Sequence, residues 1–118
     1  MKSITLEIGG EKRVFHFGLG FLGNFLEKEN IQFHEIDEKI KGNPFKWMPL
    51  IMFYSLSFGY TRKNEFAPFD AFDVAEWVDE LGIDNSIIFD FFEAFRQSLT
   101  KDVPVNENQE VKKKVTKK

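Results

Sequence analysis

Two histidines and their acidic neighbours are the residues best suited to metal chemistry in this chain. His16 stands beside Val14 in an alternating segment, and His34 stands in an acidic stretch with Glu35 and Glu38. A zinc site on one helix face needs the spacing His-Glu-x-x-His. Position 38 holds Glu where that pattern has its second His. The sequence therefore predicts no metal site.

The carboxylates between residues 70 and 80 are numerous enough to raise the question of acid–base catalysis. A catalytic pair needs two carboxyl groups in environments that push their pKa values apart. The spacing here is instead that of a helix cap, a first turn and a polar helix face. The carboxylates concerned are Asp70, Asp73, Glu76, Asp79 and Glu80. We expect no catalytic residue and a protein that is not an enzyme.

A Gly-x-Gly-x-x-Gly pattern occurs at Gly18, Gly20 and Gly23, after a predicted strand and before a predicted helix. Dinucleotide binding through this pattern requires a βαβ unit, with a second parallel strand and an acidic residue about 20 residues further on. Helices follow here instead. The pattern therefore predicts a sharp strand-to-helix turn with close packing. We expect neither a cofactor nor a small-molecule substrate.

The charge of the chain is unevenly distributed. The net charge is −3, but the six Lys and three acidic residues from Lys101 onward give +3, so residues 1–100 carry −6. Phosphate neutralisation needs a clustered basic surface, so we expect no nucleic-acid partner for the domain. The sequence contains no Cys, which excludes disulfides, thiolate metal sites and thiol catalysis.

The chain shows no signal for a membrane. Its longest apolar run lies between Trp47 and Phe58, well short of the roughly 20 residues that a spanning helix needs. The first residues lack the apolar core of about 7–15 residues that a signal peptide contains. We expect a cytoplasmic protein without a membrane partner.

Apolar residues alternate near the start of the chain. Ser3–Ile8 places Ile4, Leu6 and Ile8 on one face, and the segment from Lys12 to Phe17 returns after Gly9-Gly10. Strict alternation is typical of a half-buried strand, and Gly-Gly favours a two-residue hairpin turn. The sequence predicts a β-hairpin that needs helices to pack on.

The remaining chain has the periodicity of helices. The predicted ranges are 20–29, 31–42, 47–60, 70–81 and a last helix from Asp84 or Asn85 to Thr100. Phe33, Ile36 and Ile40 form the predicted apolar stripe of the second helix. The predicted stripe of the fourth consists of Phe72, Ala75, Trp77, Val78 and Leu81. That of the last helix consists of Ile87, Ile88, Phe91, Phe92, Phe95 and Leu99. The prediction is an α+β domain over residues 1–101 with a predominantly helical fold, followed by a disordered Lys-rich tail over residues 102–118.

The stretch from Pro44 to Tyr60 is apolar on all sides. A surface helix keeps a polar face, so this segment is expected to be a buried central element. Pro49 has no N–H and its ring strikes the preceding turn, so we expect a broken start at residues 44–48 and regular helix after it.

Aromatic residues are unusually frequent, with 15 Phe, 2 Trp and 2 Tyr making up 16% of the chain. They form a Phe-rich core, or part of them lines a partner groove or an oligomer interface. The composition leaves both readings open. The candidates for a partner-binding surface are Met48, Met52, Phe53, Phe91, Phe92 and Phe95. The last helix is the element expected to carry that surface.

The order of these features gives a further clue. The segment ITLEIGGEKRVFHF runs directly into GLGFLGNFLEKEN, and the helix PFKWMPLIMFYSLSFGY follows. A capped DAFDVAEWVDELG helix and a final helix with a Lys-rich end complete the chain. This layout, over roughly residues 1–100, resembles the tail assembly chaperones of long-tailed bacteriophages and their prophage relatives.

The resemblance implies a non-enzymatic protein that binds the helical tape measure protein while the tail tube assembles around it. It also implies a tendency to self-associate and a location in the cytoplasm of the bacterial host. A groove that takes an amphipathic helix suits this role, and Phe and Met suit re-packable surfaces. The alternative is a small adaptor that binds one cellular partner and has no connection with phage assembly.

Overall fold

The chain begins with an antiparallel hairpin in which β1 spans Ser3–Ile8 and β2 spans Glu11–His16. The computed structural model of the protein describes residues 3–100. Gly9 and Gly10 have φ angles of 66° and 85°, which fits the type I′ turn that joins twisted strands most readily. The register pairs Ile8 with Glu11 at the turn. The predicted hairpin is confirmed.

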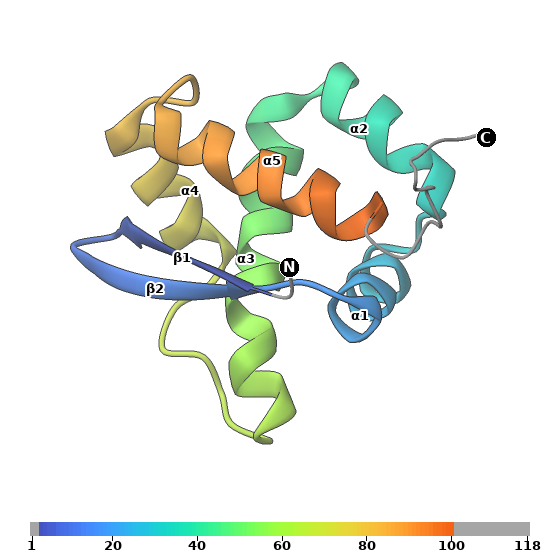
Figure 1. The fold of residues 1–118 in the computed structure, drawn as a ribbon, viewed down its shortest axis with the longest axis horizontal. Helices are drawn as coiled ribbons and strands as arrows, with labels where there is room; N and C mark the ends of the chain where they lie inside the picture. Colours follow the sequence, from blue (N-terminus) through green and yellow to red (C-terminus); the bar gives the residue numbers. More distant parts are fainter. Residues whose placement is uncertain (1–2, 101–118) are drawn as a thin grey trace, which may run out of the picture.

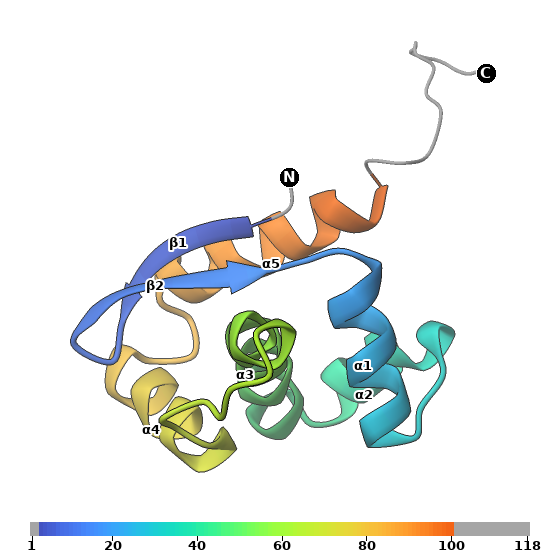
Figure 2. The same cartoon turned by 90° about the horizontal axis from the view of Figure 1, so that it is seen from below.

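Helices make up most of the remaining described residues. They are α1 (Leu19–Glu29), the 3₁₀ helix η1 (Phe33–Glu35), α2 (Ile36–Gly42), α3 (Pro44–Arg62), α4 (Ala71–Leu81) and α5 (Ser86–Thr100). Figure 1 shows α3 crossing behind the hairpin, and Figure 2 shows α4 on one side of α3 with α1 and α2 on the other. The predicted α+β class is confirmed. The tail predicted for residues 102–118 lies outside the described residues.

Helix α3 is continuous from Pro44 to Arg62, so the predicted break at residues 44–48 is wrong. Pro44 occupies the first turn, where a missing N–H costs nothing. Pro49 is buried inside the helix, and an interior proline costs about 3 kcal/mol or more. Trp47, Ile51 and Met52 are buried around it. Each large apolar side chain contributes about 1.5–3 kcal/mol on burial, which offsets the missing hydrogen bond.

Residues 31–42 do not form the single helix that their periodicity predicts. Glu35 accepts a hydrogen bond at 2.7 Å from the backbone N–H of Gln32, and Gln32 caps η1 in return. This reciprocal cap starts the helical backbone at residue 33 in a 3₁₀ turn, and α2 begins only at Ile36. Ile36 is buried, whereas Phe33 in the 3₁₀ turn is 53% exposed.

Helix α4 starts where predicted, and Trp77, Val78 and Leu81 of its predicted stripe pack on the core, but Phe72 does not. Asp70 accepts a hydrogen bond at 2.9 Å from the backbone N–H of Asp73, which fixes the helix start. Val74 and Val78 are the buried residues. Phe72 is 82% exposed, so its predicted place in the apolar stripe is wrong. Residues four apart share a face, and Phe72 lies two steps of about 100° from Val74.

The hairpin and α5 meet in a cluster of Phe rings. Phe91 of α5 lies with its ring centroid 5.3 Å from that of Phe15 and 5.5 Å from that of Phe17. Phe95 and Phe21 continue the cluster at 5.9 Å from each other. Edge-to-face pairs at these distances add about 0.5–1.5 kcal/mol to the burial of the rings. Through these rings β2 and α1 pack against α5.

Candidate functional site

An apolar groove lies between α2 and α5. We call it the α2–α5 groove; its volume is about 400 Å³. Its lining residues come from η1, α2, α3 and α5, and they are Phe33, His34, Ile36, Asp37, Ile40, Met48, Phe92, Phe95, Arg96 and Leu99. A smaller hollow of about 240 Å³ shares Phe33, Phe95 and Leu99 with it and reaches Leu19 at the start of α1. The two together form one apolar depression along α5.

Three of the six residues predicted to bind a partner meet in this groove. Met48 of α3 lies opposite Phe92 and Phe95 of α5, and the three come from segments more than 40 residues apart in sequence. Met48 and Phe92 are half-buried, whereas Phe95 is only 4% exposed and packs against Phe91. A groove lined in this way presents flexible Met and flat Phe surfaces.

The other three predicted residues lie elsewhere. Met52 and Phe91 are fully buried and belong to the core, so neither reaches a partner in this conformation. Phe53 lines a different hollow, where its ring lies 5.5 Å from that of Tyr54 and 6.1 Å from that of Phe69. The predicted surface is therefore divided among the groove, the core and a separate hollow.

The groove also contains residues that the sequence reasoning did not assign to a partner. Ile36, Ile40 and Leu99 supply apolar lining, and Asp37 and Arg96 supply charge. The sequence indicates the apolar ones, since Ile36, Ile40 and Leu99 belong to the predicted stripes of residues 33–40 and of the last helix. Periodicity does not show that the apolar faces of α2 and α5 are only partly in contact with each other.

The groove has the chemistry of a binding surface for an apolar segment. Among residues 3–100, no three His, Asp or Glu side chains lie close enough together to hold a metal ion. Within the same range, no helix has the length and apolar character needed to cross a bilayer. Ile, Leu, Met and Phe side chains instead form a concave apolar wall, which is how proteins take up the apolar face of a helix.

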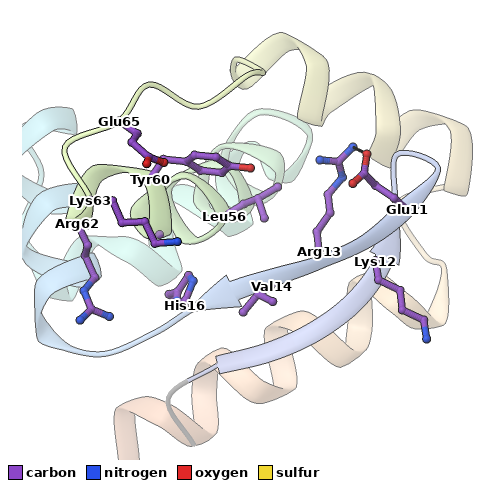
Figure 3. Close-up of a pocket in the computed structure, with 11 residues that line it drawn as sticks. Glu11, Lys12, Arg13, Val14, His16, Leu56, Tyr60, Arg62, Lys63 and Glu65 are labelled. Carbon is purple, nitrogen blue, oxygen red and sulfur yellow. Dashed lines mark hydrogen bonds and ion pairs between the residues drawn. The ribbon is translucent and has the colours of Figure 1, made fainter.

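A second hollow, the β2–α3 cleft, lies between β2 and the C-terminal half of α3 and has a volume of about 580 Å³. Figure 3 shows Leu56 and Tyr60 of α3 facing β2 across it, with Arg62, Lys63 and His16 at one end and Glu11 and Arg13 at the other. Its lining residues are Glu11, Lys12, Arg13, Val14, His16, Leu56, Gly59, Tyr60, Arg62, Lys63 and Glu65. It is the more strongly charged of the two hollows.

His16 is held in this cleft by contacts with α3. The hydroxyl of Ser55, which is fully buried, donates a hydrogen bond of 2.8 Å to the backbone carbonyl of His16. The imidazole lies directly against Gly59, where a Cβ atom would stand 2.8 Å from Nε2. Burial, and then the positive charges of Arg62 and Lys63, lower the pKa of His16 below its ordinary value. His16 is therefore neutral at neutral pH.

Lowering the pH is expected to destabilise the protein partly through His16. Its pKa in the folded state lies below the ordinary value of 6.5, so the unfolded chain binds more protons between the two values. The stabilisation is complete above pH 6.5 and is lost as the pH falls through the folded-state pKa. Denaturant titrations from about pH 7.5 to about pH 5 measure this loss. The variant His16→Gln should lose less stability over this range than the unaltered protein.

The comparison isolates His16 because the two proteins differ at this residue alone. The other charged groups that line the cleft with His16 are Lys12 and Arg13 of β2, Glu11 at the turn and Glu65 after α3. Equal losses of stability in the two proteins would show that His16 does not contribute.

Comparison with known proteins gives no family for this chain: no protein-family model, no curated protein and no solved structure matches it.

Proposed function

We propose that this protein is a non-enzymatic tail assembly chaperone of a long-tailed bacteriophage or prophage, and that it binds the helical tape measure protein in the α2–α5 groove. The observation that supports this proposal is the apolar depression along α5, to which Met48, Phe92 and Phe95 all contribute. The layout of residues 1–100 supports the choice of family.

The groove suits one kind of occupant. Its lining comes mainly from α2 and α5, and its apolar residues on α5, Phe92, Phe95 and Leu99, recur at intervals of three and four. A partner helix with apolar residues at i, i+3, i+4 and i+7 presents a matching stripe. A tape measure protein, as a long helical chain, offers many such stripes. Covering them would keep the chain from aggregating before the tail tube encloses it.

The edge of the groove is polar, which suits the outer part of such a contact. Asp37 and His34 lie on the α2 side and Arg96 on the α5 side. Arg96 is paired with Glu93 one turn earlier on the same helix. Charges at a rim orient a partner more than they add affinity. Binding should therefore depend mainly on the apolar wall.

Co-expression with the tape measure protein encoded nearby tests the proposal. The tape measure protein should be soluble and co-elute with this protein when both are present, and insoluble when it is expressed alone. The variant Phe92→Glu places a charge in the groove and should weaken the complex about 30-fold or more, the effect of a central interface residue. Affinity is measured by calorimetry with a soluble fragment of the partner.

Phe89→Glu is the matched control. Phe89 lies on the same helix, is 66% exposed and does not line the groove, so the same charge is added outside it. This variant should bind normally. A tape measure protein that is equally insoluble with and without this protein contradicts the proposal. A gene that does not lie between those of the tail tube and the tape measure protein would favour the adaptor alternative.

A further inference from the structure

Strand β2 has an edge that faces the β2–α3 cleft instead of another strand. The two-residue turn makes Ile8 and Glu11 a hydrogen-bonded pair, and such pairs alternate along an antiparallel ladder. The backbone N–H and C=O groups of Lys12, Val14 and His16 therefore point away from β1. The hydrogen bond from Ser55 to the carbonyl of His16 confirms this direction.

Two residues of this edge have main-chain groups available for pairing. Within residues 3–100, no backbone or side-chain group forms a hydrogen bond with the outward N–H and C=O of Lys12 or Val14. Both residues line the cleft and are exposed. An unpaired strand edge is a template for another extended chain, since main-chain hydrogen bonds supply affinity and the surrounding side chains supply specificity.

The surroundings of this edge are positively charged. Glu11 is paired with Arg13 at 3.3 Å, which leaves Lys12, Arg62 and Lys63 against Glu65. Figure 3 shows Arg62 and Lys63 beyond the His16 end of the strand and Lys12 near the turn. Residues 1–100 as a whole carry −6. The cleft is thus a basic site on an acidic body.

We propose that the free edge of β2 binds an extended acidic segment of a partner protein, which adds to the hairpin as a third strand. Its backbone would pair with Lys12 and Val14, and its carboxylates would lie near Lys12, Arg62 and Lys63. Leu56 and Tyr60 of α3 provide an apolar surface for the side chains between the carboxylates. The proposal does not depend on what occupies the α2–α5 groove.

Charge distinguishes this occupant from a second copy of the chain. Two β2 strands paired antiparallel about Val14 would place Lys12 of each copy beside His16 of the other. His16 lies next to Arg62 and Lys63, so cations would meet at both ends of the interface. Like charges placed opposite each other across strands are unfavourable. An acidic strand has no such repulsion.

The test uses the full-length protein and a short capped peptide in which Glu alternates with Val. Two control peptides have Lys in place of Glu, or Pro in place of Val. NMR titration should show the largest amide shifts at Lys12 and Val14, together with slower hydrogen exchange there. Only the Glu-Val peptide should bind, and raising the salt from about 50 to about 500 mM should weaken it severalfold.

Matched variants separate pairing from charge. Val14→Pro removes an outward N–H and should abolish binding, while Thr5→Pro alters the residue opposite Val14 on the other edge and should not. The double variant Lys12→Glu/Lys63→Glu should weaken binding about tenfold or more. Lys39→Glu/Lys41→Glu makes the same charge change on α2, outside the cleft, and should bind normally.

Three results would overturn the proposal. The first is equal binding of the Glu-Val and Lys-Val peptides, and the second is equal binding of the Glu-Val and Glu-Pro peptides. The third is a set of amide shifts confined to α2 and α5, which would place the peptide in the other groove. None of these results bears on the chaperone proposal, which the co-expression experiment tests separately.

Discussion

Replacing Phe91 by Ala is expected to lower the free energy of unfolding by about 3–5 kcal/mol, the usual cost of removing a buried ring. Phe91 is fully buried, and its ring lies within 5.5 Å of those of Phe15 and Phe17. Those two residues belong to the hairpin and to its exit toward α1. The cavity left by the ring would loosen the contact between the hairpin and α5.

Phe89 provides the control on the same helix. Its side chain is 66% exposed, so Phe89→Ala should change the free energy of unfolding by no more than about 0.5 kcal/mol. Guanidinium titrations followed by circular dichroism measure both variants.

Because a domain of this size has a total stability of about 5–15 kcal/mol, Phe91→Ala alone unfolds it if the stability is at the lower limit. Phe91→Leu leaves a smaller cavity and should remain measurable. Equal stabilities of Phe91→Ala and Phe89→Ala would contradict the central place of Phe91.

The parts of the fold that could be predicted are those fixed by local chemistry. Alternation and the Gly9-Gly10 turn predicted the hairpin, because both signals act over neighbouring residues. Asp70 marked the start of α4 in the same way, through its hydrogen bond with Asp73. None of these features depends on a distant part of the chain.

The errors occur where distant residues decide the structure. Pro49 predicts a broken helix by itself, but burial among residues of α3 and its neighbours keeps the helix continuous. Phe33 and Phe72 are apolar, and their apolar character predicts burial, yet both are exposed. Phe72 is exposed because Val74 and Val78 determine which face of α4 is buried. Such choices are made by packing, and one sequence does not reveal them.

The candidate site was predicted in part for the same reason. Periodicity predicts that Phe91, Phe92 and Phe95 form one apolar stripe of the last helix. It does not indicate which side of that stripe the rest of the protein covers. The hairpin covers Phe91, while Phe92 and Phe95 border the groove. Met48 and Met52 are separated in the same way on α3. Which edge stays open depends on how the neighbouring helices are placed.

Arg13 is the residue whose importance the sequence indicated least. It shares a face of β2 with Phe15, and its side chain is only 13% exposed. The guanidinium donates hydrogen bonds to the carbonyls of Ile8 at 2.9 Å and Gly9 at 3.1 Å. It lies 4.1 Å from the centroid of the Trp77 ring in α4. Arg13 thus ties the hairpin turn to α4.

Replacing Arg13 by Met is expected to cost about 2–5 kcal/mol of folding stability. Met keeps the apolar stem, so the loss comes from hydrogen bonds of a charged group, at about 1.5–3 kcal/mol, and from a cation–π contact of about 0.5–2 kcal/mol. Arg13→Lys should recover only part of this, because an ammonium group lacks the planar fork that binds both carbonyls.

Lys12→Met is the control, since Lys12 is the neighbouring cation and its side chain is exposed. It should change the free energy of unfolding by about 0.5 kcal/mol or less. Urea titrations of the three variants, followed by the combined fluorescence of Trp47 and Trp77, measure the differences. The turn and Trp77 are close enough that a Cβ on Gly9 would lie 2.6 Å from the indole. Loss of the guanidinium should therefore also shift the fluorescence of the folded state. Unchanged stability and fluorescence in Arg13→Met would show that apolar packing alone holds the hairpin turn on α4.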